Sequence, residues 1–328
     1  MCRSPICASR PGVVFLMATL GVVISTVIVG VSFSWLTGMP ILVALVFGAL
    51  ISPTDPVAVL GVLRAAKLRK SLEMKIAGES LFNDGVGYVV YLALVGVAFG
   101  AAEHGVIPGD SDFLAGAAIL FAKEALGGFV IGGVLGWLVF LIMRRIDDWS
   151  VEVPLTSALA LGGYALAGAL RVSAPIMAVV SGLFIGHEGR RDGMTQKTRD
   201  YVDAFWTLID EILNAVLFLM IGFEVFAVAF PTAHVLAGAG AVVFALIARL
   251  GAVAIPILML RPFRGFERDV IPVMTWGGLK GGISIALALA LPDGEWKPLI
   301  LTATYMAVVF SIIVQGLTVT RLARALTR

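Results

Sequence analysis

The chain has 328 residues, of which 59% are hydrophobic and only 14% are charged. Soluble domains carry about 25% charged residues, so this composition excludes a soluble globular protein and indicates that the lipid bilayer is its solvent. The net charge of +2 is too small to predict binding to nucleic acid. Two cysteines, Cys2 and Cys7, are too few for a disulfide framework, and no Cys/His spacing predicts a zinc site.

Ten apolar segments, most of them long enough to cross a bilayer, follow one another along the chain. They cover residues 12–36, 40–63, 74–100, 114–143, 153–170, 174–187, 205–229, 233–260, 270–292 and 298–320. The sixth is short, and an amphipathic stretch from Thr195 precedes the seventh and is expected at the membrane interface. We therefore predict an all-α, multi-pass membrane protein with about ten transmembrane helices.

The positions of the basic residues predict the orientation of these helices. Most of the 24 lysines and arginines fall in connections on one side of the membrane, whereas only Arg171 and Lys297 lie in connections on the other. Positive residues accumulate in cytoplasmic loops. We expect an integral protein of the cell inner membrane, with its N- and C-termini in the cytoplasm.

Glycines recur every four residues in the fourth segment, at Gly128, Gly132 and Gly136. Small residues at this spacing let a neighbouring helix approach closely, so we expect tight packing along this face.

Two of the predicted spans are interrupted by residues that break helices. Pro53 and Pro56 flank Asp55, and each removes a backbone donor and disfavours helix at the residue before it. In the ninth span, glycines surround Lys280 in the sequence WGGLKGG. We predict breaks near 52–56 and 277–282. Paired breaks of this kind are typical of transporters built from inverted repeats, where Asp55 and Lys280 would compensate the half-helix ends.

The third span carries acids in the sequence GESLFNDGVGY, at Glu79 and Asp84, with Asn83 between them. Asp84 follows Lys75 by nine residues, and Asp55 precedes Arg64 by nine, which places both acids about 13 Å from the cytoplasmic surface. Ionisable groups at this depth usually mark ion or proton paths, although each could instead belong to a structural ion pair.

Burial disfavours the charged form of a carboxylate, so a proton and a hard cation can compete for Asp84. Sodium and lithium prefer oxygen ligands. The predicted cation ligands are Asp84, Thr54, Asn83 and Asp55, together with freed carbonyls. Arg249 also lies deep in its span, and we expect it to pair with an acid in the core.

The stretches SPTDPVAVL, GESLFNDG, APIMAVVSGLFIG, LNAVLFLMIGFEV and WGGLKGGISIALAL resemble, in order, those of NhaP-type sodium/proton antiporters of the monovalent cation:proton antiporter-1 family. The resemblance implies that Asp84 carries the ion and the proton, with Asn83 before it. It implies that Thr54 and Asp55 form an unwound crossover and that Glu79 pairs with a cation of the glycine-rich span. The Asn–Asp form of the motif implies one-for-one, electroneutral exchange, and the family forms homodimers.

The sequence departs from this family at two points. Lys280 stands where the family usually has arginine, and lysine cannot make a bidentate contact, so a Glu79–Lys280 pair depends on the reach of the lysine. The family also usually has about three more spans before residue 11. We therefore expect residues 1–328 to form a single transmembrane antiporter domain that is N-terminally truncated relative to the family, an incomplete inverted-repeat fold with ion-translocating core helices in 40–100 and 233–292.

The predicted function is exchange of Na⁺, or Li⁺ or K⁺, for H⁺ by competition at Asp84, with Asn83, Glu79, Lys280, Asp55 and Arg249 as functional residues. The chain is not expected to be an enzyme or to need a cofactor; its partners are the bilayer, a monovalent cation, the proton and a second copy of itself. Two alternatives are an inactive fragment of such an antiporter and an intramembrane aspartyl protease using Asp55 and Asp84.

Overall fold

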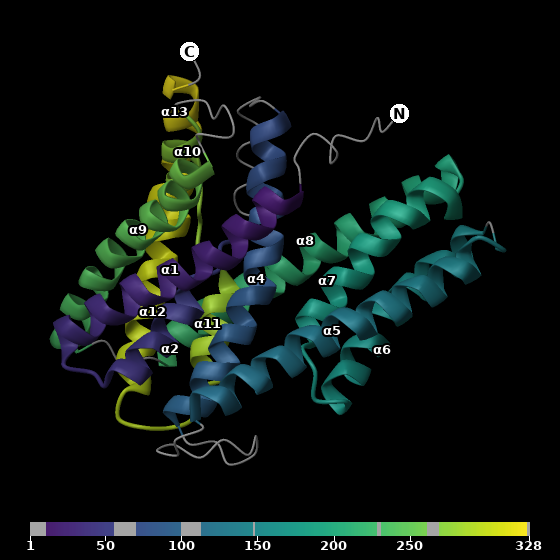
Figure 1. The fold of residues 1–328 in the computed structure, drawn as a ribbon. Coiled ribbons are helices and arrows are strands. Elements are labelled where there is room, and N and C mark those ends of the chain that lie inside the picture. Colours follow the sequence, from purple (N-terminus) through teal and green to yellow (C-terminus); the bar gives the residue numbers. More distant parts are fainter. Residues whose placement is uncertain are drawn as a thin grey trace. The chain divides into compact units, whose positions relative to one another are not determined.

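The computed structural model describes residues 11–55, 70–99, 113–146, 148–227, 231–260 and 269–326. All regular structure within these ranges is helical (Figure 1), which confirms the predicted all-α class. Each of the ten predicted segments contains a helix in its described part. The second half of the second segment, from Pro56 on, lies outside the described residues.

The helices divide into two units, one made of Met1–Asp110 and Ile221–Arg328 and the other of Ser111–Met220. The first unit contains α1 (Pro11–Thr37), α2 (Ile41–Ile51), α4 (Lys70–Ala98), α9 (Thr232–Leu260), α10 (Val270–Trp276), α11 (Gly282–Leu289), α12 (Lys297–Phe310) and α13 (Gly316–Leu326). A π-type turn, η5 (Ser311–Gln315), joins α12 to α13. Both predicted core ranges, 40–100 and 233–292, belong to this unit.

Close helix packing builds the core of the first unit around α1, α2 and α9. Gly48 of α2 lies against the backbone carbonyl of Thr26 in α1, where a Cβ would overlap that oxygen. The rings of Phe33 and Phe47 pack beside this contact with their centroids 4.3 Å apart. Such close approach is the usual way to associate apolar helices in a bilayer.

The second unit contains α5 (Phe113–Met143), α6 (Trp149–Ala169), α7 (Ala174–Phe184), a π-type segment η3 (Ile185–Gly193) and most of α8 (Gln196–Ala227). The glycines of α5 face α7 as predicted: a Cβ on Gly132 would lie 2.5 Å from the carbonyl oxygen of Met177. A Cβ on Gly128 would likewise lie 2.5 Å from the carbonyl oxygen of Ser173, and one on Gly136 would lie 3.1 Å from the Cβ of Phe184. The amphipathic stretch from Thr195 and the seventh predicted segment are joined in one helix, α8, of 32 residues.

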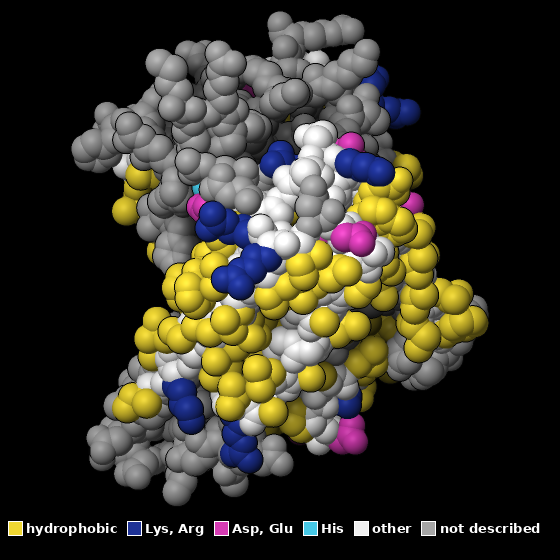
Figure 2. Space-filling view, turned by 90° about the vertical axis from the view of Figure 1, so that its right-hand side faces the viewer, with side chains coloured by type: hydrophobic (Ala, Val, Ile, Leu, Met, Phe, Trp, Pro, Cys, Tyr) yellow, Lys and Arg dark blue, Asp and Glu magenta, His cyan; other side chains and the backbone are white. Residues whose placement is uncertain are grey.

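Six helices among the described residues are long and apolar enough to cross a membrane, and Ile41–Ile51 and Ala174–Gly189 are shorter apolar helices. The ninth predicted span is not one of these six helices, because a break divides it into two short helices, α10 and α11. On the face drawn in Figure 2, hydrophobic side chains form a broad area with few charged side chains within it. This distribution suits a protein surrounded by lipid.

Candidate functional site

Both predicted interruptions are present in the first unit. Helix α2 ends at Ile51 and the chain is non-helical through Asp55, while Gly277–Gly281 separates α10 from α11. The two breaks meet, because the backbone N–H of Asp55 donates to the carbonyl of Leu279 at 2.8 Å. The Asp55 side chain lies against Gly281, where a Cβ would overlap its carboxylate. Only glycine fits this approach.

Lys280 links the two breaks through its side chain. It is 4% exposed, and its Nζ donates to the carbonyl oxygens of Ser52 at 3.0 Å and Pro53 at 3.3 Å. A positive charge thus lies at the carboxyl end of α2, while the Asp55 carboxylate lies beside the amino end of α11. Each charge opposes the helix dipole that it faces, as the sequence predicts.

Helix α4 holds the first break through a buried polar contact. The Asn83 Nδ2 donates to the Thr54 hydroxyl at 2.8 Å, and the Thr54 N–H donates to Asn83 Oδ1 at 3.3 Å. The Thr54 hydroxyl is also 3.0 Å from that of Ser80. These three side chains are at most 2% exposed. Asn83 therefore fixes the unwound stretch against α4.

Asp84 lies one residue further around α4 than Asn83 and is only partly buried. It interacts electrostatically with Asp55, Lys280 and Glu79. Asn83, beside it on α4, is buried. The residues predicted to surround the ion are therefore brought together around the two breaks.

The expected Glu79–Lys280 pair is wrong. Glu79 pairs with Arg249 of α9, whose Nη1 and Nη2 donate to the two carboxylate oxygens at 2.5 and 2.7 Å. The planar guanidinium matches the carboxylate, a contact that an ammonium cannot make. Arg249 also donates to the carbonyl of Met274 at the end of α10. The expectation that Arg249 pairs with a core acid is confirmed.

Several polar residues of this region were missed from the sequence. Ser80 precedes Asp84 by four residues and Tyr91 follows it by seven, so helical spacing alone could have placed both on the same side of α4. The Tyr91 hydroxyl donates to the carbonyl of Leu287 in α11 at 2.8 Å. Ser311 and Gln315 of the last span contact the second break, and no sequence pattern indicated that neighbour.

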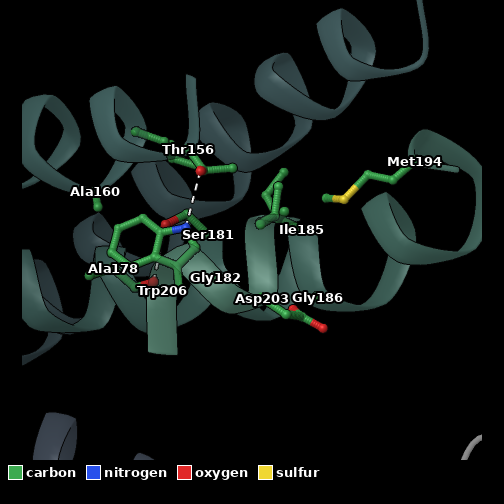
Figure 3. A pocket seen from close by; sticks show the side chains of 12 residues that line it. Thr156, Ala160, Ala178, Ser181, Gly182, Ile185, Gly186, Met194, Asp203 and Trp206 are labelled. Atoms are coloured by element: carbon green, nitrogen blue, oxygen red, sulfur yellow. Dashed lines mark hydrogen bonds between the residues drawn. The ribbon is translucent and has the colours of Figure 1, made fainter. Parts of the chain in front are cut away.

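A separate cavity of about 400 Å³ lies within the second unit, between α6, α7, η3 and α8. Figure 3 shows its mainly apolar lining, with the Trp206 indole N–H donating to the Thr156 hydroxyl at 3.1 Å. Asp203 is the one ionisable residue among those that line it. A lone acid in an apolar cavity offers neither a carboxylate pair nor a cage of oxygen ligands.

Comparison with known proteins places the chain in a family. Residues 9–325 match the family model of the sodium/hydrogen exchanger, transmembrane. The chain belongs to this family. A Na⁺/H⁺ antiporter NhaP of Pseudomonas aeruginosa is 48% identical to this family member over 320 residues, 94% of the chain and 73% of the relative.

More distant relatives extend the comparison. A Na⁺/H⁺ antiporter NhaH of Halobacillus aidingensis is 33% identical, with 92% of this exchanger-family chain and 73% of the relative covered. The structure of the sodium proton antiporter MjNhaP1 from Methanocaldococcus jannaschii at pH 8 superposes with a TM-score of 0.78 at 19% identity, covering 96% of the chain and 79% of MjNhaP1. This likeness establishes the shared antiporter fold.

Proposed function

We propose that this chain exchanges Na⁺, or Li⁺ or K⁺, for H⁺ across the membrane, and that Asp84 carries either ion. The observation that supports the proposal is the crossing of two broken helices beside an acid, Asp84, that interacts electrostatically with charged residues of both breaks. The names of the relatives, Na⁺/H⁺ antiporters, point to the same activity. We propose Na⁺, Li⁺ or K⁺ and H⁺ as the substrates, with no cofactor and no covalent chemistry.

Oxygen atoms suited to a small alkali ion lie at the first break, against the helix that carries Asp84. The hydroxyls of Thr54 and Ser80 are adjacent to each other on the α4 side of the break. Asp55 is an electrostatic neighbour of Asp84. We propose that a cation takes the Asp84 carboxylate with some of these oxygens and water, and that Asn83 contributes by holding Thr54 in place. Protonation of Asp84 would remove the charge that holds the cation, so the two ions exclude each other.

The charges of the neighbouring residues favour a one-for-one stoichiometry. Glu79 is neutralised by Arg249, and Lys280 and Asp55 face opposite half-helix ends. We propose that these four charges stay constant through the cycle while Asp84 alone changes its occupant. One Na⁺ then replaces one H⁺, and no net charge crosses the membrane.

The same geometry weighs against the protease alternative. An aspartyl protease would need two acids on intact facing helices with a water between them, whereas Asp55 lies on an unwound stretch and contacts Gly281. We further propose a homodimer in the cell inner membrane with both termini in the cytoplasm, from the charge distribution of the loops and from the family resemblance.

Substitution of Asp84 by Asn tests the function directly. The purified chain is reconstituted into vesicles that contain a pH-sensitive dye, and NaCl or LiCl is added outside. We expect a cation-dependent pH change with the natural chain, and with Asp84→Asn only the rate of protein-free vesicles. Asp293→Asn serves as the control, because the Asp293 side chain is 98% exposed in a loop.

Exchange retained by Asp84→Asn would refute the role of Asp84. Peptide cleavage by the purified chain would instead support the protease. If the natural chain is inactive, while the same chain extended upstream exchanges cations, the inactive-fragment alternative holds.

A further inference from the structure

The break in the ninth span leaves polar groups that hydrocarbon would penalise, and the last span satisfies them. The backbone N–H of Lys280 donates to the Ser311 hydroxyl at 2.8 Å. The carbonyl of Trp276, at the end of α10, accepts from Gln315 Nε2 at 3.1 Å. The Trp276 indole N–H donates to the Thr318 hydroxyl at 2.8 Å. All three contacts come from the last span, which thus satisfies groups that hydrocarbon would leave unpaired.

The three contacting side chains share one side of the last span, because they are spaced by four and three residues. Ser311 and Gln315 are 1% and 3% exposed. They bound the π-type turn η5, which interrupts the α-helical ladder between α12 and α13. Such turns are rare and frequently occur at functional sites. Most buried polar side chains in proteins have hydrogen-bond partners, and these two have theirs at the second break.

Ser311 and Gln315, which we call the clamp, are connected through further contacts to the first break, near Asp84. Lys280, held at its backbone by Ser311, places its Nζ on the carbonyls of Ser52 and Pro53. Leu279, the preceding residue, accepts the N–H of Asp55. The last span therefore holds the second break, and the second break holds the first.

We propose that Ser311 and Gln315 are positioning residues for cation binding, which act by ordering both breaks before the ion arrives. The proposal rests on the antiport function proposed above. The hydrogen bonds of Ser311 and Gln315 go to Lys280 and Trp276, so each residue acts through the second break. Loosening these contacts would require the ion to order the oxygens around it, which lowers affinity. Once the ion is bound, its oxygen ligands are ordered in the natural chain and in the variants alike, so the maximal rate should change little.

The test compares Ser311→Ala and Gln315→Leu with the control Thr304→Val. Thr304 is fully buried in the same span, but its hydroxyl donates only within its own helix, to Ile300, among the contacts described. Removing the Ser311 hydroxyl leaves the Lys280 N–H without this acceptor, so we expect its amide hydrogen to exchange about 10-fold faster. We expect the KM for Na⁺ to rise about 5-fold or more in both variants, with the maximal rate within about 2-fold of the natural chain.

The outcomes separate this inference from the function on which it rests. Unchanged Lys280 amide exchange in Ser311→Ala overturns the clamp. Faster exchange with an unchanged KM, or a fall in maximal rate at constant KM, overturns the positioning role. If the natural chain does not transport, the proposed antiport fails. Cation affinity is then measured as the LiCl concentration that raises the Tm half-maximally. For the positioning role to stand, this concentration must be higher for Ser311→Ala than for the natural chain.

Discussion

The ion pair between Glu79 and Arg249 gives the sharpest prediction about stability. Their side chains are 4% and 5% exposed, and two hydrogen bonds join them. Replacing Glu79 by Gln, or Arg249 by Met, leaves one charge buried without its counter-charge. Breaking a buried pair in this way costs about 3–5 kcal/mol of the free energy of unfolding. Replacing both residues together removes both charges and should cost much less.

The expected size of the effect follows from the length of the chain. Unfolding carries about 2.1 cal/mol/K of entropy per residue, so over 328 residues 1 kcal/mol corresponds to about 1.5 °C in Tm. We therefore expect Glu79→Gln and Arg249→Met each to lower the Tm by about 4–7 °C. The double variant should lose less than either single variant, so the coupling energy should be at least about 3 kcal/mol.

Thermal unfolding of the purified chain in detergent, followed by tryptophan fluorescence, measures all three variants. Lys280→Met is the informative comparison, because Lys280 was the partner expected from the sequence. If Glu79→Gln and Lys280→Met couple strongly, while Glu79→Gln and Arg249→Met are additive, the pairing described here is wrong and the lysine holds the glutamate.

Two further predictions concern helix packing and stoichiometry. Gly132→Ala should lower the Tm by several degrees, because the new methyl group meets the backbone of Met177. In the control Gly133→Ala nothing lies within 4 Å of the added Cβ, so the Tm should stay unchanged or rise. Equal losses of Tm in the two variants would refute the close packing of α5 on α7. Reconstituted vesicles with equal pH and equal Na⁺ concentration on both sides should show no net Na⁺ uptake when a membrane voltage is imposed, since one-for-one exchange moves no net charge. Voltage-driven uptake would exclude this stoichiometry.

The sequence predicted the interruptions because the cause is local. Pro53 and Pro56 disfavour helix whatever packs around them, and the glycines around Lys280 do the same. The glycine row of α5 was predicted for the same reason, since the spacing of Gly128 and Gly132 already defines one helix face. Helix class and position in the chain follow from such patterns.

The partner of Glu79 could not be predicted in the same way. Depth arguments place residues along the membrane normal, and both Arg249 and Lys280 were deep enough to be considered. Which of them faces α4 depends on the lateral order of helices far apart in the sequence, because Arg249 is 170 residues from Glu79. The contacts of Ser311 and Gln315 escaped prediction for the same reason.

The bridge from Lys280 to the end of α2 limits how the molecule can move. A motion that pulled the two broken helices apart would strip an ammonium of its carbonyl partners inside the membrane and expose the free ends of both half-helices, at a cost of several kcal/mol. Opening towards one side and then the other must therefore leave the crossing intact. We expect the two breaks to move together as one unit, with the surfaces that slide or part lying outside them.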